Sequence, residues 1–316
     1  MKVTVIGLGL IGGSIALDLR KAGIATELVG MDLRSDNGIR AVELGLVDTI
    51  PTEDKAFQGV DLVIIAIPVN AVCQMLPSVL DAVPDHAVVI DTGSTKGLIC
   101  KAVTSHPRRA QFVAAHPIAG TENSGPEAAF HGLFRNKTNI ICEKAKSSDE
   151  ALALASRVFD ALGMNTIFME AEEHDKHVAY VSHLSHVSSF LLGQTVLDIE
   201  KDEKNIFALA GSGFASTVRL AKSSPDMWAP IFEQNLEYLS QALLEYIMHL
   251  QKFHYHLQKR DTKELHRIMS ASNEIRRVLE GIELKQSTVH SPPAYAKAPA
   301  GEAEKATVPS DINATK

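Results

Sequence analysis

Two polar side chains follow predicted buried strands and could perform acid–base chemistry. Ser94 comes after the apolar run Ala87–Ile90, in the segment DTGSTK, and His116 directly follows the apolar run Phe112–Ala115. The carboxyl ends of parallel strands lie at one edge of a sheet, where ligands bind. Because imidazole titrates near neutrality, it can accept a proton from an alcohol. We therefore predict that Ser94 and His116 are catalytic residues at the same sheet edge.

Each of these residues also has a structural interpretation. Ser94 or Thr95 could simply cap the helix that follows, which is a common use of hydroxyl side chains. A histidine considered alone is more often structural than catalytic, but the small residues Ala119–Thr121 beside His116 favour a site. Lys96 is interpreted as structural, either solvated in the first helical turn or paired with an acid.

A glycine motif at the start of the chain predicts a dinucleotide site. Gly7, Gly9 and Gly12 follow the strand-like run Val3–Ile6, and a helical pattern begins among them. The first glycine permits a tight turn, the second lets the backbone approach a pyrophosphate, and the third lets helix and strand pack closely. The N-terminus of the helix would then bind the phosphates.

Asp32 indicates which dinucleotide is bound. It follows the second strand-like run, Leu28–Met31, where a carboxylate can accept hydrogen bonds from the adenosine ribose and disfavours a 2′-phosphate. We therefore predict NAD as the cofactor, and NADP is the alternative because Arg34 lies close by. The residues predicted to contact the cofactor are Gly7, Gly9, Leu10, Ile11, Gly12, Asp32, Pro68 and Ser94.

Four histidines occupy the first helix predicted after residue 170. They form two pairs, His174 with His177 and His183 with His186, and the i, i+3 spacing places each pair on one helical face. A metal site is not favoured, because no HExxH motif, nearby cysteine or clear carboxylate ligand accompanies them. The acidic neighbours of His174 and His177 predict that both are solvated. Ser182, His183 and His186 lie in an apolar stretch and could contact a polar ligand.

Arg219 lies among apolar and small residues and therefore requires an anionic partner. A carboxylate that receives two guanidinium hydrogen bonds is the natural partner. It could belong to a substrate or to an acid on a neighbouring helix. Trp228, the only tryptophan, is interpreted as core or interface packing.

The pattern of elements predicts two domains. Strand-like runs alternate with helical patterns up to residue 170, which predicts an α/β domain with a parallel, Rossmann-type sheet at 1–170. Helical periodicity over His177–Ile199, Phe232–Phe253 and Lys263–Leu284 predicts an all-α domain at 171–286. Residues 287–316 are rich in proline and alanine and predict a disordered tail. A partner-binding segment or an expression remnant is the alternative.

Composition narrows the class of protein. The net charge of −7 over 316 residues, without a basic stripe, argues against a nucleic-acid partner. No apolar run approaches ~18 residues, and the N-terminal run continues into the glycine motif, so we expect neither a membrane span nor a signal peptide. Cys73, Cys100 and Cys142 follow no ligand or disulfide spacing. We expect a cytoplasmic protein that binds small molecules.

Five segments together resemble the prephenate dehydrogenase family, which includes the arogenate dehydrogenases. They are GLGLIGGS, DTGSTK, AHPIAGTENSG, SHLSH, and a later arginine followed by SSPDMW. The resemblance extends from about Lys2 to Gln286. It implies a dinucleotide-binding domain followed by a helical domain that binds substrate and forms homodimers. It also implies oxidative decarboxylation of prephenate with NAD, giving 4-hydroxyphenylpyruvate, CO2 and NADH in tyrosine biosynthesis.

The resemblance also implies roles for individual residues. His116 would hydrogen-bond the C4 hydroxyl of the substrate and assist hydride loss, and Ser94 would contact that hydroxyl and orient the nicotinamide. Arg219 would bind a substrate carboxylate, and Trp228 would lie near the site of the partner subunit. The residues implied to contact the substrate are Thr121, Glu122, Ser182, His186 and Arg219.

Three other functions remain as alternatives. They are an arogenate dehydrogenase, a dehydrogenase of the same architecture that acts on a hydroxy acid or an imine, and a non-catalytic NAD-binding sensor or scaffold. The presence of Ser94, His116 and Arg219 together favours catalysis. Since the chain begins at the first predicted strand and only the tail follows Gln286, we expect neither a mutase module nor a regulatory domain.

Overall fold

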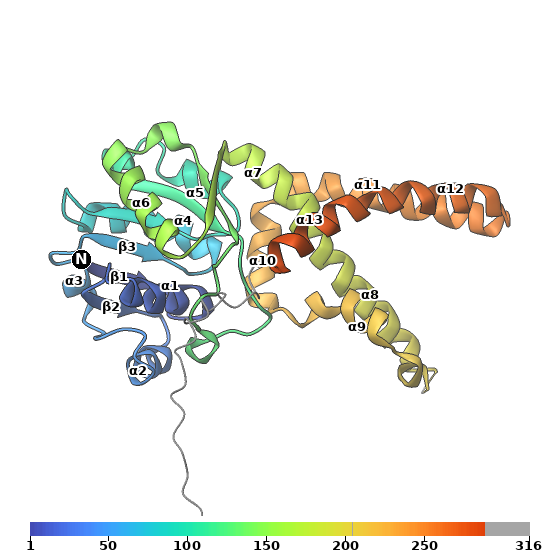
Figure 1. The fold of residues 1–316 in the computed structure, drawn as a ribbon, viewed down its shortest axis with the longest axis horizontal. Helices are drawn as coiled ribbons and strands as arrows, with labels where there is room; N and C mark the ends of the chain where they lie inside the picture. The colour runs from blue at the N-terminus through green and yellow to red at the C-terminus, as the bar shows by residue number, and fades with distance from the viewer. Residues whose placement is uncertain (204, 288–316) are drawn as a thin grey trace, which may run out of the picture. The chain divides into compact units, whose positions relative to one another are not determined.

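A seven-stranded sheet forms the N-terminal part of the computed structural model, which describes residues 1–203 and 205–287 (Figure 1). The strand order is β2-β1-β3-β4-β5-β6-β7. The strands are β1 (Lys2–Ile6), β2 (Glu27–Met31), β3 (Leu62–Ile65), β4 (Val88–Asp91), β5 (Phe112–Pro117), β6 (Thr138–Cys142) and β7 (Asn165–Met169). The chain changes direction across the sheet between β1 and β3, which is where doubly wound sheets bind ligands.

The prediction of a parallel sheet is wrong for one pair of strands. β5 and β6 run antiparallel, with His116 opposite Ile140, whereas the other pairs are parallel. A parallel pair needs a crossover connection that returns the chain to the opposite edge of the sheet. Between β5 and β6, the described regular structure is limited to the short 3-10 turn Pro126–Ala128. β6 therefore starts at the edge where β5 ends.

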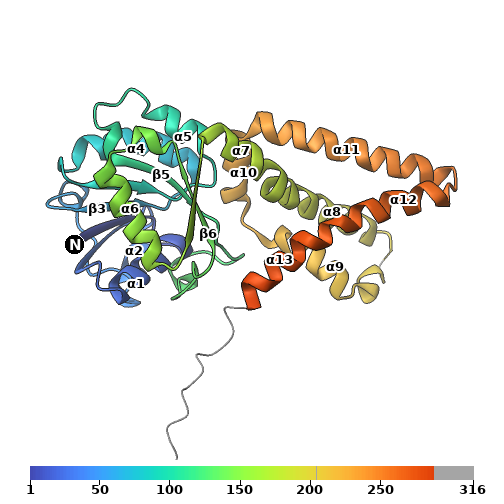
Figure 2. The same cartoon turned by 45° about the horizontal axis from the view of Figure 1, so that its top comes forward.

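Apolar side chains bury both faces of the sheet. Leu62 and Ile64 of β3 belong to one core cluster, and Val63 and Ile65 belong to the other. The first cluster includes residues of helices α1 and α6, and the second includes residues of α4 and α5 (Figure 2). The helices around the sheet are α1 (Leu10–Lys21), α2 (Ser35–Glu43), α3 (Glu53–Ala56), α4 (Val69–Ala82), α5 (Gly97–Ala102) and α6 (Asp149–Ala161).

A largely helical segment begins at Ala171. It starts with α7 (Ala171–Val178), passes through a π-helical turn (Ala179–His183) and continues as α8 (Leu184–Glu200). The helices that follow within the compact unit Met1–Ile275 are α9 (Ser212–Thr217), α10 (Pro225–Gln234), α11 (Leu236–Gln258) and α12 (Thr262–Ser272). The second unit, Arg276–Lys316, contributes α13 (Arg276–Ser287). Apart from Ser287, the predicted disordered tail lies outside the described residues.

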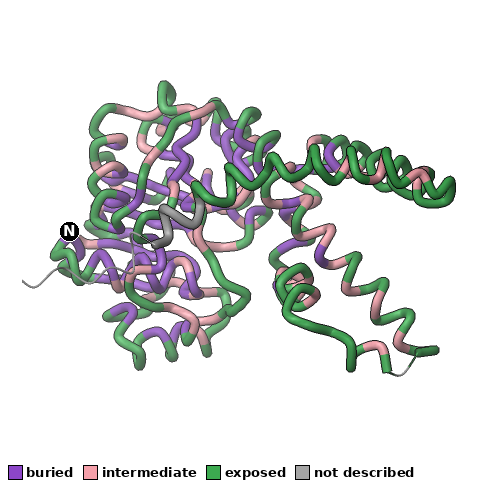
Figure 3. The backbone as a smooth tube through the Cα atoms, turned by 45° about the vertical axis from the view of Figure 1, so that its right-hand side comes forward, coloured by how far each residue is buried: buried purple, intermediate pink, exposed green. Residues whose placement is uncertain are grey.

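The second core cluster joins the helical segment to the sheet. Trp228 and Ile231 of α10 belong to the same cluster as Leu76 of α4. Figure 3 shows the buried strands and the mostly exposed helices α11 and α12. Because this packing unites residues 1–275, the domain boundary at residue 170 stays a prediction, although the type of element changes there. Within residues 1–203 and 205–287, no helix is both long and apolar enough to cross a membrane.

Candidate active site

The glycine loop joins β1 to α1 at the carboxyl edge of the sheet. Gly7 has a φ of +92°, which favours glycine, and a Cβ there would lie 2.3 Å from the carbonyl oxygen of Ala66. A Cβ on Gly12 would lie 2.0 Å from the carbonyl oxygen of Gly7, whereas a Cβ on Gly9 would meet its nearest atom at 3.9 Å. The first and third glycines therefore permit chain packing, and the second leaves space in which a pyrophosphate fits.

The carboxylate of Asp32 lies beside this loop and is held by three donors. The backbone N–H of Leu8 donates to one oxygen at 2.9 Å. The backbone N–H of Arg34 (3.0 Å) and the amide of Asn37 (3.1 Å) donate to the other oxygen. A carboxylate fixed at the end of the second strand can accept hydrogen bonds from ribose hydroxyls. The other predicted cofactor residues are Leu10 and Ile11, in the first turn of α1, and the exposed Pro68, which precedes α4.

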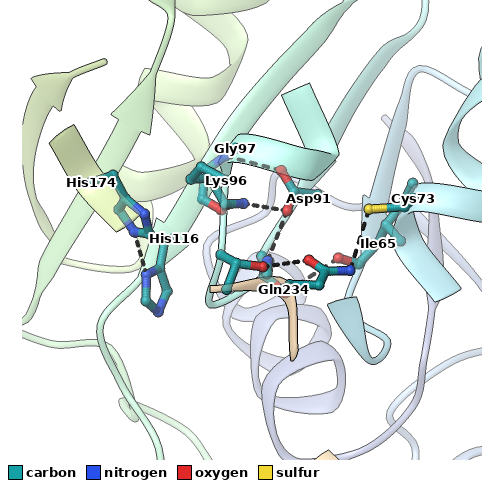
Figure 4. A network of polar contacts seen from close by, with 12 residues as sticks. Ile65, Cys73, Asp91, Lys96, Gly97, His116, His174 and Gln234 are labelled. Carbon is teal, nitrogen blue, oxygen red and sulfur yellow. Dashed lines mark hydrogen bonds and ion pairs between the residues drawn. The ribbon is translucent and has the colours of Figure 1, made fainter. Parts of the chain in front are cut away.

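Lys96 and Asp91 form an ion pair whose side chains have no exposed surface (Figure 4). The Lys96 ammonium also donates to the carbonyl oxygen of Ala115 at 2.6 Å, and the N–H of Ala115 donates to Asp91 at 3.2 Å. Burial raises the pKa of the Asp91 carboxyl, and the positive charge of Lys96 opposes that effect. The pair connects the end of β4 to the residue before His116. The interpretation of Lys96 as the partner of an acid is confirmed.

The capping interpretation of Ser94 and Thr95 is wrong. Lys96 is the residue at the N-terminal cap of α5, and its own side chain accepts no capping hydrogen bond. Thr95 donates instead to Oε1 of Gln234 at 2.7 Å. The backbone N–H groups of Lys96 and of the next residue each donate to an oxygen of Asp175 at 2.8 Å. This loop, with Ser94 half-buried in it, is therefore held by side chains of α7 and α10.

His116, near the end of β5, contacts a second histidine (Figure 4). Its Nδ1 lies 2.8 Å from Nε2 of His174, and Nδ1 of His174 lies 2.8 Å from Oδ1 of Asp175. The prediction that His174 is solvated is wrong, because its side chain has no exposed surface. α7 packs against α5, so His174 and Asp175 turn inward. His177, one turn away, is exposed as predicted.

Burial determines the charge of the histidines here. It is the main reason that the pKa of His116 lies well below 6.5, and the positive charge of Lys96 lowers this pKa further, as a proton on His174 or His183 would. Burial also lowers the pKa of His174, although the carboxylate of Asp175 opposes that effect. Both rings are therefore neutral near pH 7, and a neutral imidazole can accept a proton.

His186 and Arg219 form a second polar group in the helical segment. The rings of His186 and Trp228 stack, with centroids 3.5 Å apart and planes inclined by 25°. Burial lowers the pKa of His186, and the nearby positive charge of Arg219 contributes. Arg219 is exposed and forms no ion pair within residues 1–203 and 205–287, so the internal salt bridge is not found there. Trp228 is buried in the core, as one of its two interpretations predicted.

The π-helical turn Ala179–His183 determines which histidines share a helical face. An α-helix advances by about 100° per residue, so an uninterrupted helix would place His174 and His186 about 120° apart. A π-helical turn inserts one extra residue, which reduces that angle to about 20° by the same geometry. The turn therefore allows His174 and His186 to point toward the same side of the helix. Such turns occur frequently at functional sites.

Three predicted substrate residues form no hydrogen bond with the His116 side chain in the part of the chain that the structure describes. Thr121 and Glu122 are exposed after β5, where Oγ1 of Thr121 accepts a hydrogen bond from the N–H of Asn123 at 3.2 Å. Ser182 contributes its backbone carbonyl, which lies 3.0 Å from Nδ1 of His186. The contacts of these three residues with a substrate stay predictions.

The sequence analysis missed the residues that connect the helical segment to this edge of the sheet. They are His174, Asp175, Gln234 and Asn235. Asn235 donates to the backbone carbonyl of Asp175 at 2.8 Å, and its amide nitrogen lies 3.1 Å from Nδ1 of His183. The sequence signal that could have indicated His174 and Asp175 was a histidine next to an aspartate in the first turns of a helix. Among the described residues, no cluster of histidine, cysteine or acidic side chains is arranged to hold a metal ion.

Two family models match the chain. A model described as the nucleotide-binding domain of prephenate dehydrogenase matches residues 15–168. A model described as the dimerization domain of prephenate dehydrogenase matches residues 170–271. The prephenate dehydrogenase of Bacillus subtilis is 32% identical over 299 residues, which covers 90% of this chain and 78% of that protein.

Two solved structures resemble both parts of the chain. A structure of prephenate dehydrogenase from A. aeolicus, in complex with hydroxyphenyl propionate and NAD+, has a TM-score of 0.80 at 29% identity. The match covers 88% of this chain and 98% of that one. A structure of Synechocystis arogenate dehydrogenase has a TM-score of 0.72 at 29% identity and covers 88% of this chain and 100% of that one. The similarity therefore extends over the sheet and the helical segment together.

Proposed function

The chain belongs to the prephenate dehydrogenase family, and from this membership we propose that it oxidises and decarboxylates prephenate with NAD. The products are 4-hydroxyphenylpyruvate, CO2 and NADH, and the pathway is tyrosine biosynthesis. The observation that carries the proposal is the position of His116. It is a half-buried, neutral imidazole at the carboxyl edge of the sheet, in contact with the helical segment.

The glycine loop and Asp32 hold the NAD. The space beside Gly9 accommodates the pyrophosphate, and the first turn of α1, with Leu10 and Ile11, provides free N–H groups. The carboxylate of Asp32 accepts hydrogen bonds from the ribose hydroxyls and repels the 2′-phosphate of NADP. NAD, when bound, supplies the acceptor for the hydride that leaves C4 of the substrate.

His116 accepts the proton of the C4 hydroxyl as the hydride leaves. Its lone pair is available near pH 7 because burial keeps the ring neutral. C4 then becomes a carbonyl carbon, the bond from the ring to its carboxylate breaks, and the electron pair of that bond enters the ring as CO2 departs. The proton returns from His116 to the oxygen as the ring becomes aromatic, so the overall reaction releases no proton. Ser94 orients the hydroxyl and the nicotinamide.

Residues of the helical segment hold the charged ends of the substrate. The guanidinium of Arg219 is exposed and forms no ion pair among the described residues, so it can donate two hydrogen bonds to a carboxylate. His186 and Ser182 hold the side-chain end of the substrate, and Thr121 and Glu122 line the site. The main contribution of the protein to catalysis is therefore to position C4 of the substrate against the cofactor.

We propose that two copies of the chain form a homodimer through the helical segment. α8 and α11 expose large apolar side chains that a partner copy would bury. They include Leu191, Leu197, Leu244, Met248 and Leu250, each more than half exposed. Light scattering would measure a mass near twice 34.2 kDa if the proposal holds. The cytoplasmic location stays a prediction, which the free thiols of the three cysteines support.

Replacing His116 by asparagine tests the proposed function. Loss of a proton acceptor should lower kcat by about 10²- to 10⁴-fold, because general-base catalysis contributes about that much. The formation of NADH is measured with prephenate, arogenate and simple hydroxy acids in parallel. His177→Asn is the matched control, because His177 is exposed and belongs to the same histidine-rich segment as His174.

Three results of this experiment would contradict the proposal. Near-normal turnover by His116→Asn would remove His116 from the mechanism. Faster turnover of arogenate or of a hydroxy acid by the unaltered protein would change the substrate. NAD binding without turnover of any of these compounds would favour a non-catalytic sensor.

A further inference from the structure

The contacts of His116 determine which of its ring nitrogens carries the proton. We propose that His174 and Asp175 are positioning residues that keep the proton of neutral His116 on Nδ1 and leave the Nε2 lone pair for the substrate hydroxyl. This inference rests on the proposed function, in which His116 is the proton acceptor.

The argument begins at Asp175, whose carboxylate acts only as an acceptor. The backbone N–H groups of Lys96 and Gly97 donate to its two oxygens, each at 2.8 Å. A backbone N–H cannot accept a hydrogen bond, so neither contact requires a proton on the carboxyl group. Nδ1 of His174 lies 2.8 Å from Oδ1 of the same carboxylate. It must therefore carry the proton and donate it in that hydrogen bond.

The protonation of His174 determines that of His116. Burial lowers the pKa of His174, so its ring is neutral near pH 7 and carries one proton, which lies on Nδ1. Nε2 of His174 is then a lone-pair acceptor. The contact of 2.8 Å between this atom and Nδ1 of His116 requires a donor on the His116 side. With its proton on Nδ1, neutral His116 has its lone pair on Nε2.

The opposite tautomer of His116 could not act as the proton acceptor in the same orientation. Its Nε2–H would face the hydroxyl as a donor, and its lone pair would face His174. In the proposed tautomer, the imidazolium formed by proton transfer donates Nδ1–H to His174, and Asp175 supplies a negative charge beyond it. This charge offsets the nearby positive charge of Lys96, which lowers the pKa of His116.

His174 is the better residue to replace, because Asp175 also anchors the loop that contains Lys96. His174→Phe keeps a ring of similar shape in the fully buried position but removes both nitrogens. His174→Gln supplies an amide oxygen that can again accept from Nδ1 of His116. His177→Phe is the control, since His177 is exposed on the same helix.

We expect His174→Phe to lower kcat by about 10- to 100-fold, the usual cost of losing an orienting partner, with a smaller change in the KM of prephenate. His174→Gln should recover part of the loss, and His177→Phe should match the unaltered protein. Equal losses in the Phe and Gln variants, or none in either, would overturn the positioning role. If the unaltered protein does not oxidise prephenate, the proposed function fails instead.

A second measurement does not depend on turnover or on the folding of a variant. Nitrogen NMR of the protein with 15N-labelled histidine distinguishes a protonated ring nitrogen from an unprotonated one. The resonances of His116 are identified by their loss in His116→Asn. A proton on Nδ1 and none on Nε2 at pH 7 supports the proposal, and the reverse distribution refutes it.

Discussion

Replacing Lys96 by methionine would leave a buried carboxylate without its counter-ion. The side chains of Lys96 and Asp91 both have no exposed surface, so water cannot replace the lost ammonium. Asp91 would keep only the N–H groups of Gly93 (2.8 Å) and Ala115 (3.2 Å). Removing one partner of a buried ion pair costs about 3–5 kcal/mol. Because whole domains are stable by only about 5–15 kcal/mol, the variant should lose about a fifth or more of its free energy of unfolding.

Urea unfolding followed by circular dichroism measures this loss. The double variant Asp91→Asn/Lys96→Met removes the charge but keeps one oxygen, which can accept from either Gly93 or Ala115, so it should recover part of the lost free energy of unfolding. Lys201→Met is the control, because the Lys201–Asp198 pair lies on the surface and its loss should leave the urea midpoint unchanged.

Two results would refute this reasoning about charge. If the double variant is as unstable as Lys96→Met, the loss arises from the contact of Lys96 with the carbonyl of Ala115 rather than from the unpaired carboxylate. If Lys96→Met unfolds at the same urea concentration as the unaltered protein, the buried ion pair does not contribute to the free energy of unfolding.

Three further predictions concern pH and the cofactor loop. Burial lowers the pKa of His183 from 6.5 to about 4, so below pH 6.5 the unfolded chain binds the proton first. The contribution of His183 to the unfolding free energy should then fall by about 1.4 kcal/mol per pH unit down to about pH 4, and urea titrations of His183→Gln should show a slope smaller by that amount. Gly9→Ala should keep the thermal midpoint but weaken NAD binding by about tenfold or more in calorimetry. Gly12→Ala should lower both the thermal midpoint and the affinity for NAD, because its Cβ would lie 2.0 Å from the carbonyl oxygen of Gly7. Asp32→Asn should lower the ratio of kcat/KM for NAD over NADP by about tenfold or more in parallel assays, and an unchanged ratio would exclude Asp32 from cofactor selection.

Local patterns predicted the elements of the sheet well. The apolar run before His116 became β5, and the glycine motif lies between β1 and α1 as its spacing indicated. These features depend on short-range preferences, namely which residues favour a buried strand and which permit a tight turn. The antiparallel direction of β6 was missed, because it depends on the absence of a crossover helix rather than on the composition of the strand itself.

The errors at the site have a common physical origin. The turn around His174 and Asp175 is acidic, which normally indicates a solvated helical face. The packing of α7 against α5 is a long-range contact, and it buries His174 against His116. In the same way, the capping interpretation of Thr95 used only its neighbours in sequence, whereas its partner is Gln234. Periodicity cannot reveal a contact between segments so distant along the chain.

The hydrogen bonds of Asp175 restrict how this protein can be recombined with its relatives. Its carboxylate belongs to α7, but the N–H groups that it binds belong to the loop before α5. A chimaera that exchanges segments at residue 170 would separate these partners between two parental sequences. Because the side chain of Thr95 also donates to Gln234 across this boundary, the natural unit of exchange includes the DTGSTK loop with α7 and α10.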